Sequence, residues 1–297
     1  MIKNLIISGG SMRGFTFLGA IKYLEEIDIL QNIETFTGTS IGACLSLCLS
    51  LSFSSKELID IFTNLDIEKQ RDITVDNVLN FFEDYGLDNG DKILNILKII
   101  IDKKIKLLKK ENLITEDFNE NITLRDLFNI TKKKLTIVGC CLNNMETIFY
   151  NYELTPDMKV LDAIRITFSI PFIFKPVLID GKYYVDGGIT NNYPIELFDS
   201  KESIGLVSVN KKIYNLKIEN IEQYFISILW SSFFYELKKK IEMYKEITIN
   251  IECELNSFDF ALDKLKKKEL IDIGYYQTKE IFKQKFKDHL TVYQPMI

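Results

Sequence analysis

The order of apolar and polar residues along the chain predicts alternating strands and helices. Short apolar runs typical of buried strands occur at residues 5–7 and 35–37. A glycine-rich turn follows each run. A helical segment comes next, at 15–27 after the first turn and up to about residue 53 after the second. Two strand–turn–helix units in close succession indicate an α/β sheet with crossover helices.

The remainder of the chain continues this alternation without repeats, low-complexity blocks or a Pro/Gly/Ser-rich linker. Turn signals at Asn143-Asn144 and Asp180-Gly181 predict two hairpins between short strands. The other predicted elements are a mostly helical region at 56–131, strands at 135–142, 147–152, 177–179, 183–185, 204–209 and 248–255, and helices at 160–167, 221–244 and 261–286. We therefore expect a single α/β domain over residues 1–297, with a mostly parallel central sheet between two layers of helices.

Composition narrows the class of protein. The 297 residues are 46% hydrophobic and 27% charged, which allows a large core, and the net charge of −5 provides no basic field for nucleic acid. Five cysteines without CxxC or Cys/His spacing indicate buried, reduced thiols rather than a disulfide framework or a metal site. We expect no metal and no other cofactor.

The sequence shows no targeting or membrane-spanning segment. Residues 1–8 lack the apolar core and cleavage site of a signal peptide. The longest weakly polar stretch, 41–53, has 13 residues, whereas a spanning helix needs about 20. We expect a cytoplasmic or intracellular protein, either soluble or in peripheral contact with a membrane.

A serine stands in the second glycine-rich turn, within a G-x-S-x-G sequence. A strand leads into this turn and an apolar helix leaves it, which is the context that exposes a nucleophilic hydroxyl at the edge of a sheet. The helix start supplies unpaired N–H groups that would stabilise negative charge there. The turn consists of Gly38, Thr39, Ser40, Ile41 and Gly42. We interpret Ser40 as a candidate nucleophile, and a plain turn before a helix is the alternative.

The first glycine-rich turn favours an anion nest over a dinucleotide site. It consists of Gly9, Gly10, Ser11, Met12, Arg13 and Gly14. Serine at position 11 breaks the G-x-G-x-x-G pattern, and no acidic residue ends a second strand about 20 positions later. Backbone N–H groups of such a loop could instead bind one transition-state oxygen. Arg13 could add charge there, or it could tie the loop to a neighbouring carboxylate.

A catalytic serine needs a proton acceptor, and the choice of residues is narrow. The chain has one histidine, His289, in a polar basic tail near the C-terminus. A carboxylate is therefore the more plausible base. Asp186 follows an apolar strand and precedes Gly187 and Gly188, which would leave one face of its carboxylate open. Burial would raise its pKa from about 4 and make it a stronger base.

Together, the ordered motifs resemble the patatin-like phospholipases. The resemblance covers roughly residues 3–210, with 211–297 forming a C-terminal helix–strand–helix part. Besides the glycine loop, the G-x-S-x-G turn and Asp186-Gly187-Gly188, it rests on residues 19–24, 169–176 and the run from Tyr184 through Asn191, Asn192, Tyr193 and Pro194. It implies a patatin-like fold and a histidine-free pair, with Ser40 as nucleophile and Asp186 as base.

The same resemblance implies a reaction and a set of oxyanion donors. Patatin-like enzymes cleave fatty-acyl esters of phospholipids and related glycerolipids, and some transfer the acyl group. The backbone amides around Gly10, Ser11 and Met12 would form the oxyanion hole. The family usually has a third glycine where this chain has Ser11, and a positive φ there would cost serine about 1 kcal/mol or more.

Two further segments bear on lipid binding, and protein partners are not predicted. Residues 224–235 are rich in aromatic side chains and would line a lipid channel or pack as a core helix. Residues 93–110 form a basic amphipathic helix that would lie on an anionic membrane or present a solvated face. The lysines concerned are Lys103, Lys104, Lys106, Lys109 and Lys110.

Two other functions remain open from the sequence. An α/β-hydrolase could use Ser40, an aspartate and His289 in that chain order, but such folds place several strands before the nucleophile. Alternatively, the chain could be an inactive lipid- or protein-binding module that retains the motifs.

Overall fold

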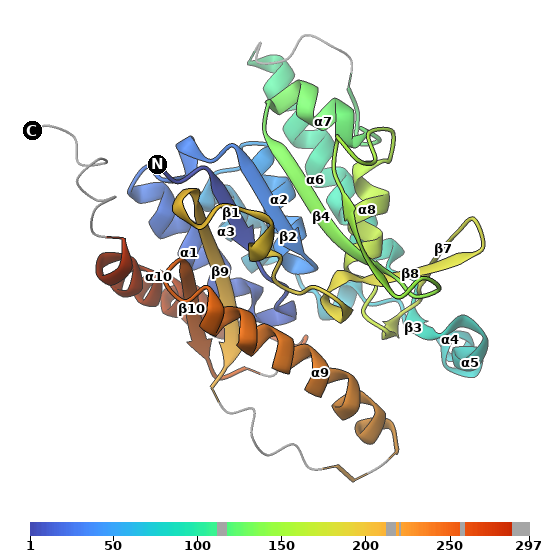
Figure 1. The fold of residues 1–297 in the computed structure, drawn as a ribbon. Coiled ribbons are helices and arrows are strands. Elements are labelled where there is room, and N and C mark those ends of the chain that lie inside the picture. The colour runs from blue at the N-terminus through green and yellow to red at the C-terminus, as the bar shows by residue number, and fades with distance from the viewer. Residues whose placement is uncertain (112–117, 212–217, 220, 256–258, 287–297) are drawn as a thin grey trace, which may run out of the picture.

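An eight-stranded sheet forms the centre of the computed structural model (Figure 1), which describes residues 1–111, 118–211, 218–219, 221–255 and 259–286. Its strands are β1 (Asn4–Ile7), β2 (Thr35–Thr39), β4 (Lys134–Cys141), β5 (Glu146–Tyr150), β7 (Val177–Ile179), β8 (Lys182–Asp186), β9 (Ser203–Asn210) and β10 (Thr248–Cys253). The strand order is β10-β9-β1-β2-β4-β8-β7, and β5 pairs with β4. The five strands from β10 to β4 are mutually parallel, whereas β5, β7 and β8 are added antiparallel.

Helices cover both faces of this sheet (Figure 1). They are α1 (Gly14–Glu26), α2 (Ile41–Ser50), α3 (Ser55–Asn64), α6 (Asp91–Lys110), α7 (Leu124–Thr131), α8 (Val160–Thr167), α9 (Ile221–Met243) and α10 (Lys264–Lys285). The predicted α/β class, with helices on both sides of a mostly parallel sheet, is confirmed. None of the helices within the described ranges is long and apolar enough to cross a bilayer.

Both predicted hairpins are present. β4 and β5 pair antiparallel across the Asn143-Asn144 turn. Between β7 and β8, Asp180 and Gly181 have φ values of +49° and +74°, which is the left-handed pair that a tight hairpin turn requires. All five cysteines are buried and unpaired, as predicted.

Sequence periodicity did not reveal a small second sheet and a short helical pair. β3 (Gly86–Asp88) pairs in parallel with β6 (Phe172–Phe174). Before β3, the chain forms α4 (Val75–Leu79) and α5 (Phe81–Asp84). Three-residue strands and helices of four or five residues are too short to show a hydrophobic period.

The apolar face of α6 points into the protein. Its buried side chains include Leu97, Ile101, Ile105 and Leu108. Lys104 is also buried, and its Nζ donates to both carboxylate oxygens of Glu57 at 2.9 and 3.0 Å. Lys104 therefore belongs neither to a membrane-facing nor to a solvated surface, which were the two interpretations of 93–110. The apolar face is used for the core, so only the remaining lysines are exposed.

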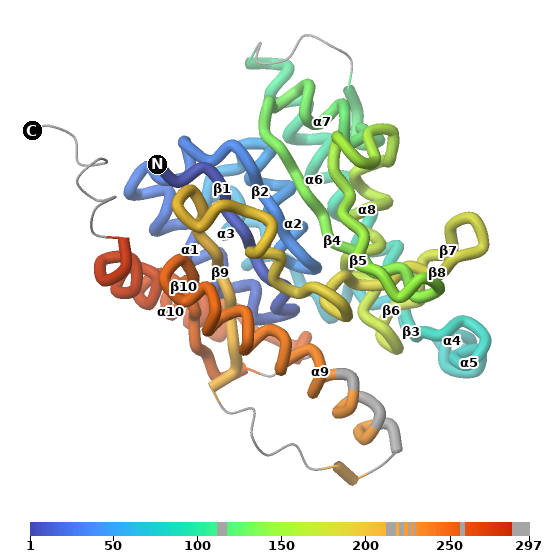
Figure 2. The backbone as a smooth tube through the Cα atoms, viewed as in Figure 1, coloured from blue at the N-terminus to red at the C-terminus, as the bar shows by residue number. Residues whose placement is uncertain are grey.

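Two glycines allow α1 and α10 to pack in close contact, side by side (Figures 1 and 2). A Cβ added at Gly19 would lie 1.9 Å from the carbonyl oxygen of Ile271. One added at Gly274 would lie 1.8 Å from the carbonyl oxygen of Thr16. The C-terminal helix is therefore fixed against the helix that begins at the first glycine loop.

We expect Gly274→Ala to destabilise the protein, because backbone atoms of α1 cannot move aside as a side chain could. Alanine gains up to about 1 kcal/mol in helix propensity, but overpacking typically costs about 1–3 kcal/mol, and contact with backbone lies at the upper end. The expected net loss is about 1–2 kcal/mol in urea unfolding. The control is Asp272→Ala on the exposed side of α10. Unchanged or higher stability of Gly274→Ala would contradict this packing.

Candidate active site

β4 brings the carboxyl ends of two other strands together. β5 occupies one edge of β4. The opposite edge is shared, with Thr39 of β2 beside Val138 and Asp186 of β8 beside Gly139. Because β2 runs parallel to β4 and β8 antiparallel, their carboxyl ends face each other along this edge. Ser40, the residue after β2, is thereby placed next to Asp186.

Ser40 has a strained backbone that the surrounding structure fixes. Its φ is +55° and its ψ −127°, a conformation that typically costs a residue with a side chain about 1–3 kcal/mol. The two glycines of the turn permit close backbone contacts: a Cβ on Gly38 would lie 2.3 Å from the backbone of Gly42, and one on Gly42 would lie 2.2 Å from the Ile7 carbonyl oxygen. The Ser40 amide donates to the Thr167 hydroxyl at 2.9 Å. The structure therefore has the sharp strand–turn–helix geometry that the motif predicted.

Asp186 is buried beside Ser40. Its carboxylate accepts a hydrogen bond at 2.7 Å from the amide of Gly188, and the Ser40 side chain interacts with it as well. Both interactions favour the charged form, but burial opposes it more strongly and raises the pKa of Asp186 to about 7. The group is therefore a far stronger base than an ordinary aspartate and is still partly ionised near neutral pH.

The first glycine loop lies against the same site. Ser11 has a φ of +48°, so this position does require the left-handed region where the sequence has no glycine. The amide of Gly9 donates to the carbonyl of Asn192 at 3.2 Å, and that of Arg13 to the carbonyl of Gly10 at 3.1 Å. Between them, the amides of Gly10, Ser11 and Met12 have no acceptor among the hydrogen bonds of the described residues.

Arg13 anchors the glycine loop to the neighbouring strand β9. Its side chain is buried, and Nε donates to the carbonyl oxygen of Ser208 on β9 at 3.1 Å. Burial lowers the pKa of the guanidinium. Of the two roles open from the sequence, the structure favours the anchoring one, through the backbone carbonyl of Ser208.

Two asparagines connect the three motifs, and sequence reasoning gave them no role. The side-chain amide of Asn192 donates to the carbonyl of Gly9 at 3.2 Å, which reciprocates the backbone bond from Gly9 to Asn192. The Thr39 hydroxyl donates to the Asn191 carbonyl at 3.1 Å. Asn191 and Asn192 are among the residues that carry the family resemblance, so the sequence did contain a signal for their role. Thr167, which holds the Ser40 amide, had no such signal.

Ser40 lies in the walls of two cavities. The larger, of about 130 Å³, is lined by apolar side chains of α2, α3 and α6, including Ile61, Phe62, Ile93 and Leu97. The smaller, of about 40 Å³, is lined by Asp186, the loop residues Gly9, Gly10, Ser11 and Arg13, and Trp230 and Phe233 of α9. Two aromatic side chains of the segment 224–235 thus line the smaller cavity. His289, the alternative base, lies outside the described residues.

Comparisons with known proteins agree with this geometry. The chain matches the model of the patatin-like phospholipase family over residues 5–199. It is 30% identical over 293 residues to an uncharacterized protein of Acanthamoeba polyphaga mimivirus, which covers 94% of this chain and 93% of the relative. It is also 30% identical over 230 residues to a probable lipid hydrolase of Invertebrate iridescent virus 6, with 75% and 74% covered.

A solved structure shares the fold. VipD from Legionella pneumophila superimposes with a TM-score of 0.61 at 19% identity, over 96% of this chain and 67% of that one. Sequence match and fold therefore agree, and the chain belongs to the patatin-like phospholipase family, a family of lipid ester hydrolases.

Proposed function

We propose that this protein hydrolyses fatty-acyl esters of phospholipids or related glycerolipids, with Ser40 as nucleophile and Asp186 as base. The observation that carries the proposal is that Ser40 lines the same cavity as the buried carboxylate of Asp186, whose pKa is raised to about 7. A base with a pKa near the working pH transfers protons most effectively. The oxygen of Ser40 is thereby activated without a histidine.

The reaction proceeds in two halves. Asp186 takes the hydroxyl proton as Ser40 Oγ attacks the ester carbonyl, and the tetrahedral intermediate then expels the lipid alcohol, which receives the proton from Asp186. A water molecule next attacks the acyl-enzyme while Asp186 takes its proton. Collapse releases the fatty acid and returns the proton to Ser40.

The glycine loop supports the developing oxyanion. The amides of Gly10, Ser11 and Met12 stand at the cavity next to Ser40 without an acceptor among the described residues. Removing one such donor typically slows acyl transfer by about 100- to 1000-fold. Positive φ at Ser11 is compatible with an amide that is turned toward the site, as a nest requires.

The two cavities suggest how a lipid is oriented. The larger one has an apolar wall that suits an acyl chain, and the smaller one, with polar loop atoms and the Trp230 ring, suits the alcohol side. Ser40 lies between them, where the scissile ester would be. This assignment supports an acyl hydrolase over the alternative of an inactive binding module, because Ser40 stands at the boundary of both cavities and Asp186 lies in the wall of the smaller one.

Ser40→Ala and Asp186→Asn should each lower fatty-acid release from phospholipid vesicles by about 10⁴-fold, because each removes one member of a pair that acts as a unit. Ser40→Ala should also abolish labelling by a fluorophosphonate. Asp180→Asn, in the exposed turn before β8, is the matched control and should retain full activity. Equal activity of all variants would refute the mechanism, and an unlabelled, inactive wild type would favour the binding module.

The rate should depend on pH through Asp186, because only the ionised carboxylate accepts the proton. We expect kcat/KM for a soluble short-chain ester to rise about tenfold per pH unit below the pKa of about 7 and to level off above it. Initial rates between pH 5 and 9, corrected for spontaneous hydrolysis, measure this profile. A rate that is flat from pH 5 to 7 would show that Asp186 titrates in its ordinary range.

Stability should change with pH in the opposite direction. A carboxyl whose pKa is raised by folding binds its proton more tightly in the native state, so it destabilises the fold as pH rises from 3.8 to about 7. Asp186→Asn removes this ionisation. Its stability advantage over wild type should be about 2.6 kcal/mol larger at pH 8 than at pH 5, at about 1.4 kcal/mol per pKa unit. Parallel urea unfolding at the two pH values measures it, and a constant difference would contradict the buried charge.

A further inference from the structure

A short helical projection stands out from the body of the fold (Figure 1). It comprises residues 72–86, which include α4 and α5, and we call it the α4–α5 knob. Its most exposed large side chains are Val75, Val78, Leu79 and Phe82, with 56–86% of their surface accessible. Exposed apolar residues gathered at one tip mark an interaction surface, whereas scattered ones do not.

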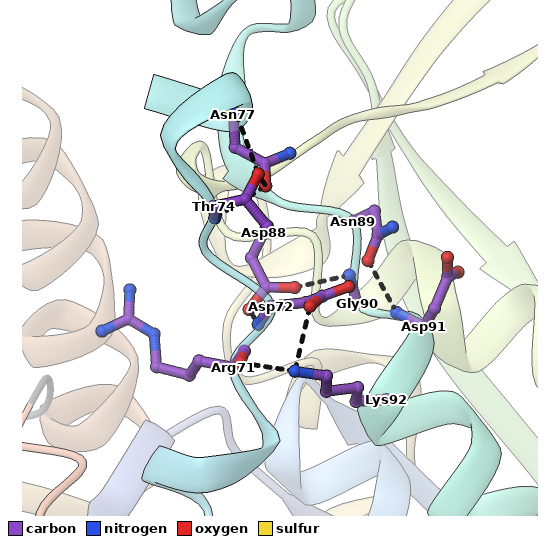
Figure 3. Close-up of polar contacts among 9 residues, drawn as sticks. All are labelled: Arg71, Asp72, Thr74, Asn77, Asp88, Asn89, Gly90, Asp91 and Lys92. Atoms are coloured by element: carbon purple, nitrogen blue, oxygen red, sulfur yellow. Dashed lines mark hydrogen bonds and ion pairs between the residues drawn. The ribbon is translucent and has the colours of Figure 1, made fainter. Parts of the chain in front are cut away.

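Hydrogen bonds and an ion pair hold the stem of the knob in place (Figure 3). The fully buried carboxylate of Asp88 accepts from the amides of Asp72 and Gly90, both at 2.8 Å. Lys92 closes the stem from the other side, with its Nζ 2.9 Å from the Asp72 carboxylate and 3.3 Å from the Arg71 carbonyl oxygen. The apolar tip is therefore held away from the core by a polar clamp.

The knob lies beside the mouth of the candidate active site. Phe81 packs against Phe172, with ring centres 6.4 Å apart. Phe172 directly follows Ile170 and Pro171, which line the smaller cavity together with Ser40 and Asp186. On the other side, Gln70 lines the larger cavity just before the knob begins. Segments that flank or contact the knob thus contribute to the walls of both cavities.

The charge of the knob selects among lipid surfaces. No lysine or arginine occurs between Arg71 and Lys92, whereas Asp76 and Glu83 are exposed. Anionic headgroups would be repelled by this face, whereas zwitterionic headgroups present cationic groups to it. A convex tip also suits insertion into a bilayer interface better than it suits a groove-binding peptide.

We propose that the α4–α5 knob docks the enzyme on zwitterionic membrane surfaces by inserting its apolar side chains between headgroups, which places the mouth of the site at the bilayer. This inference rests on the proposed lipid hydrolase function. The membrane contact is thereby assigned to the acidic and apolar tip and not to the lysines of α6. One of those lysines, Lys104, forms an internal ion pair.

The binding test uses the full chain carrying Ser40→Ala, so that vesicles stay intact, and phosphatidylcholine vesicles in a flotation assay. Adding Leu79→Ser and Phe82→Ser should weaken partitioning at least tenfold. Leu154→Ser with Tyr276→Ser removes comparably exposed apolar residues elsewhere and should leave it unchanged. Replacing part of the phosphatidylcholine by phosphatidylserine should not strengthen binding. Equal binding of the knob variant and its control, or tighter binding to the anionic vesicles, would overturn the proposal.

Activity on two substrates separates this proposal from the proposed function. With Ser40 intact, Leu79→Ser/Phe82→Ser should hydrolyse a soluble short-chain ester at the wild-type rate but phosphatidylcholine vesicles at least tenfold more slowly. A wild type inactive on both substrates would reject the hydrolase function itself. A wild type active on both, with the knob variant unimpaired on vesicles, would reject the knob alone. A dimer in size-exclusion chromatography that the two substitutions dissolve would assign the tip to a second copy and overturn membrane docking.

Discussion

The site depends on the way in which one edge of β4 is divided between two strands of opposite direction. β2 ends beside Val138 and β8 ends beside Gly139, so the chain places a serine and an aspartate in contact although they are 146 positions apart. The gap between the strand ends is bridged by Thr167, whose hydroxyl accepts from the Ser40 amide and donates to the Val138 carbonyl. In the proposed mechanism, this placement lets Asp186 take the proton that a histidine takes in the usual triad.

This arrangement is energetically unfavourable at several residues of the candidate active site. Ser40 and Ser11 both have positive φ, and Asp186 is a buried acid whose ionisation is opposed by its surroundings. Such local costs are offset by the packing around them, where the reciprocal bonds between Gly9 and Asn192 join the loop to the segment after β8. A site in which this carboxylate is less buried would be more stable. The pKa of Asp186 would then fall to its ordinary value, and the carboxylate would be a weaker base.

Much of this was predictable because the motifs are local. Glycines around Ser40 and after Asp186 signal sharp turns in any context, and the scarcity of histidine singled out a carboxylate as base. What sequence could not provide was long-range partnership. The pairing of Lys104 with Glu57 removes one lysine from a helix face that was expected to be exposed. The anchoring of Arg13 on a β9 carbonyl depends on parallel strand order, and hydrophobic periodicity does not encode that order.

The apolar residues from α3 through α6 form two groups. Those of α3 and α6 face inward and form the wall of the larger cavity, whereas those of the α4–α5 knob face outward at its side. A lipid acyl chain must leave one apolar medium before it enters another, and the barrier is lowest when the two are adjacent. The Asp88 carboxylate accepts from the amides of Asp72 and Gly90, so it joins the stem of the knob to the residue before α6. One continuous segment thus contributes to a cavity wall within the fold and to an apolar tip outside it.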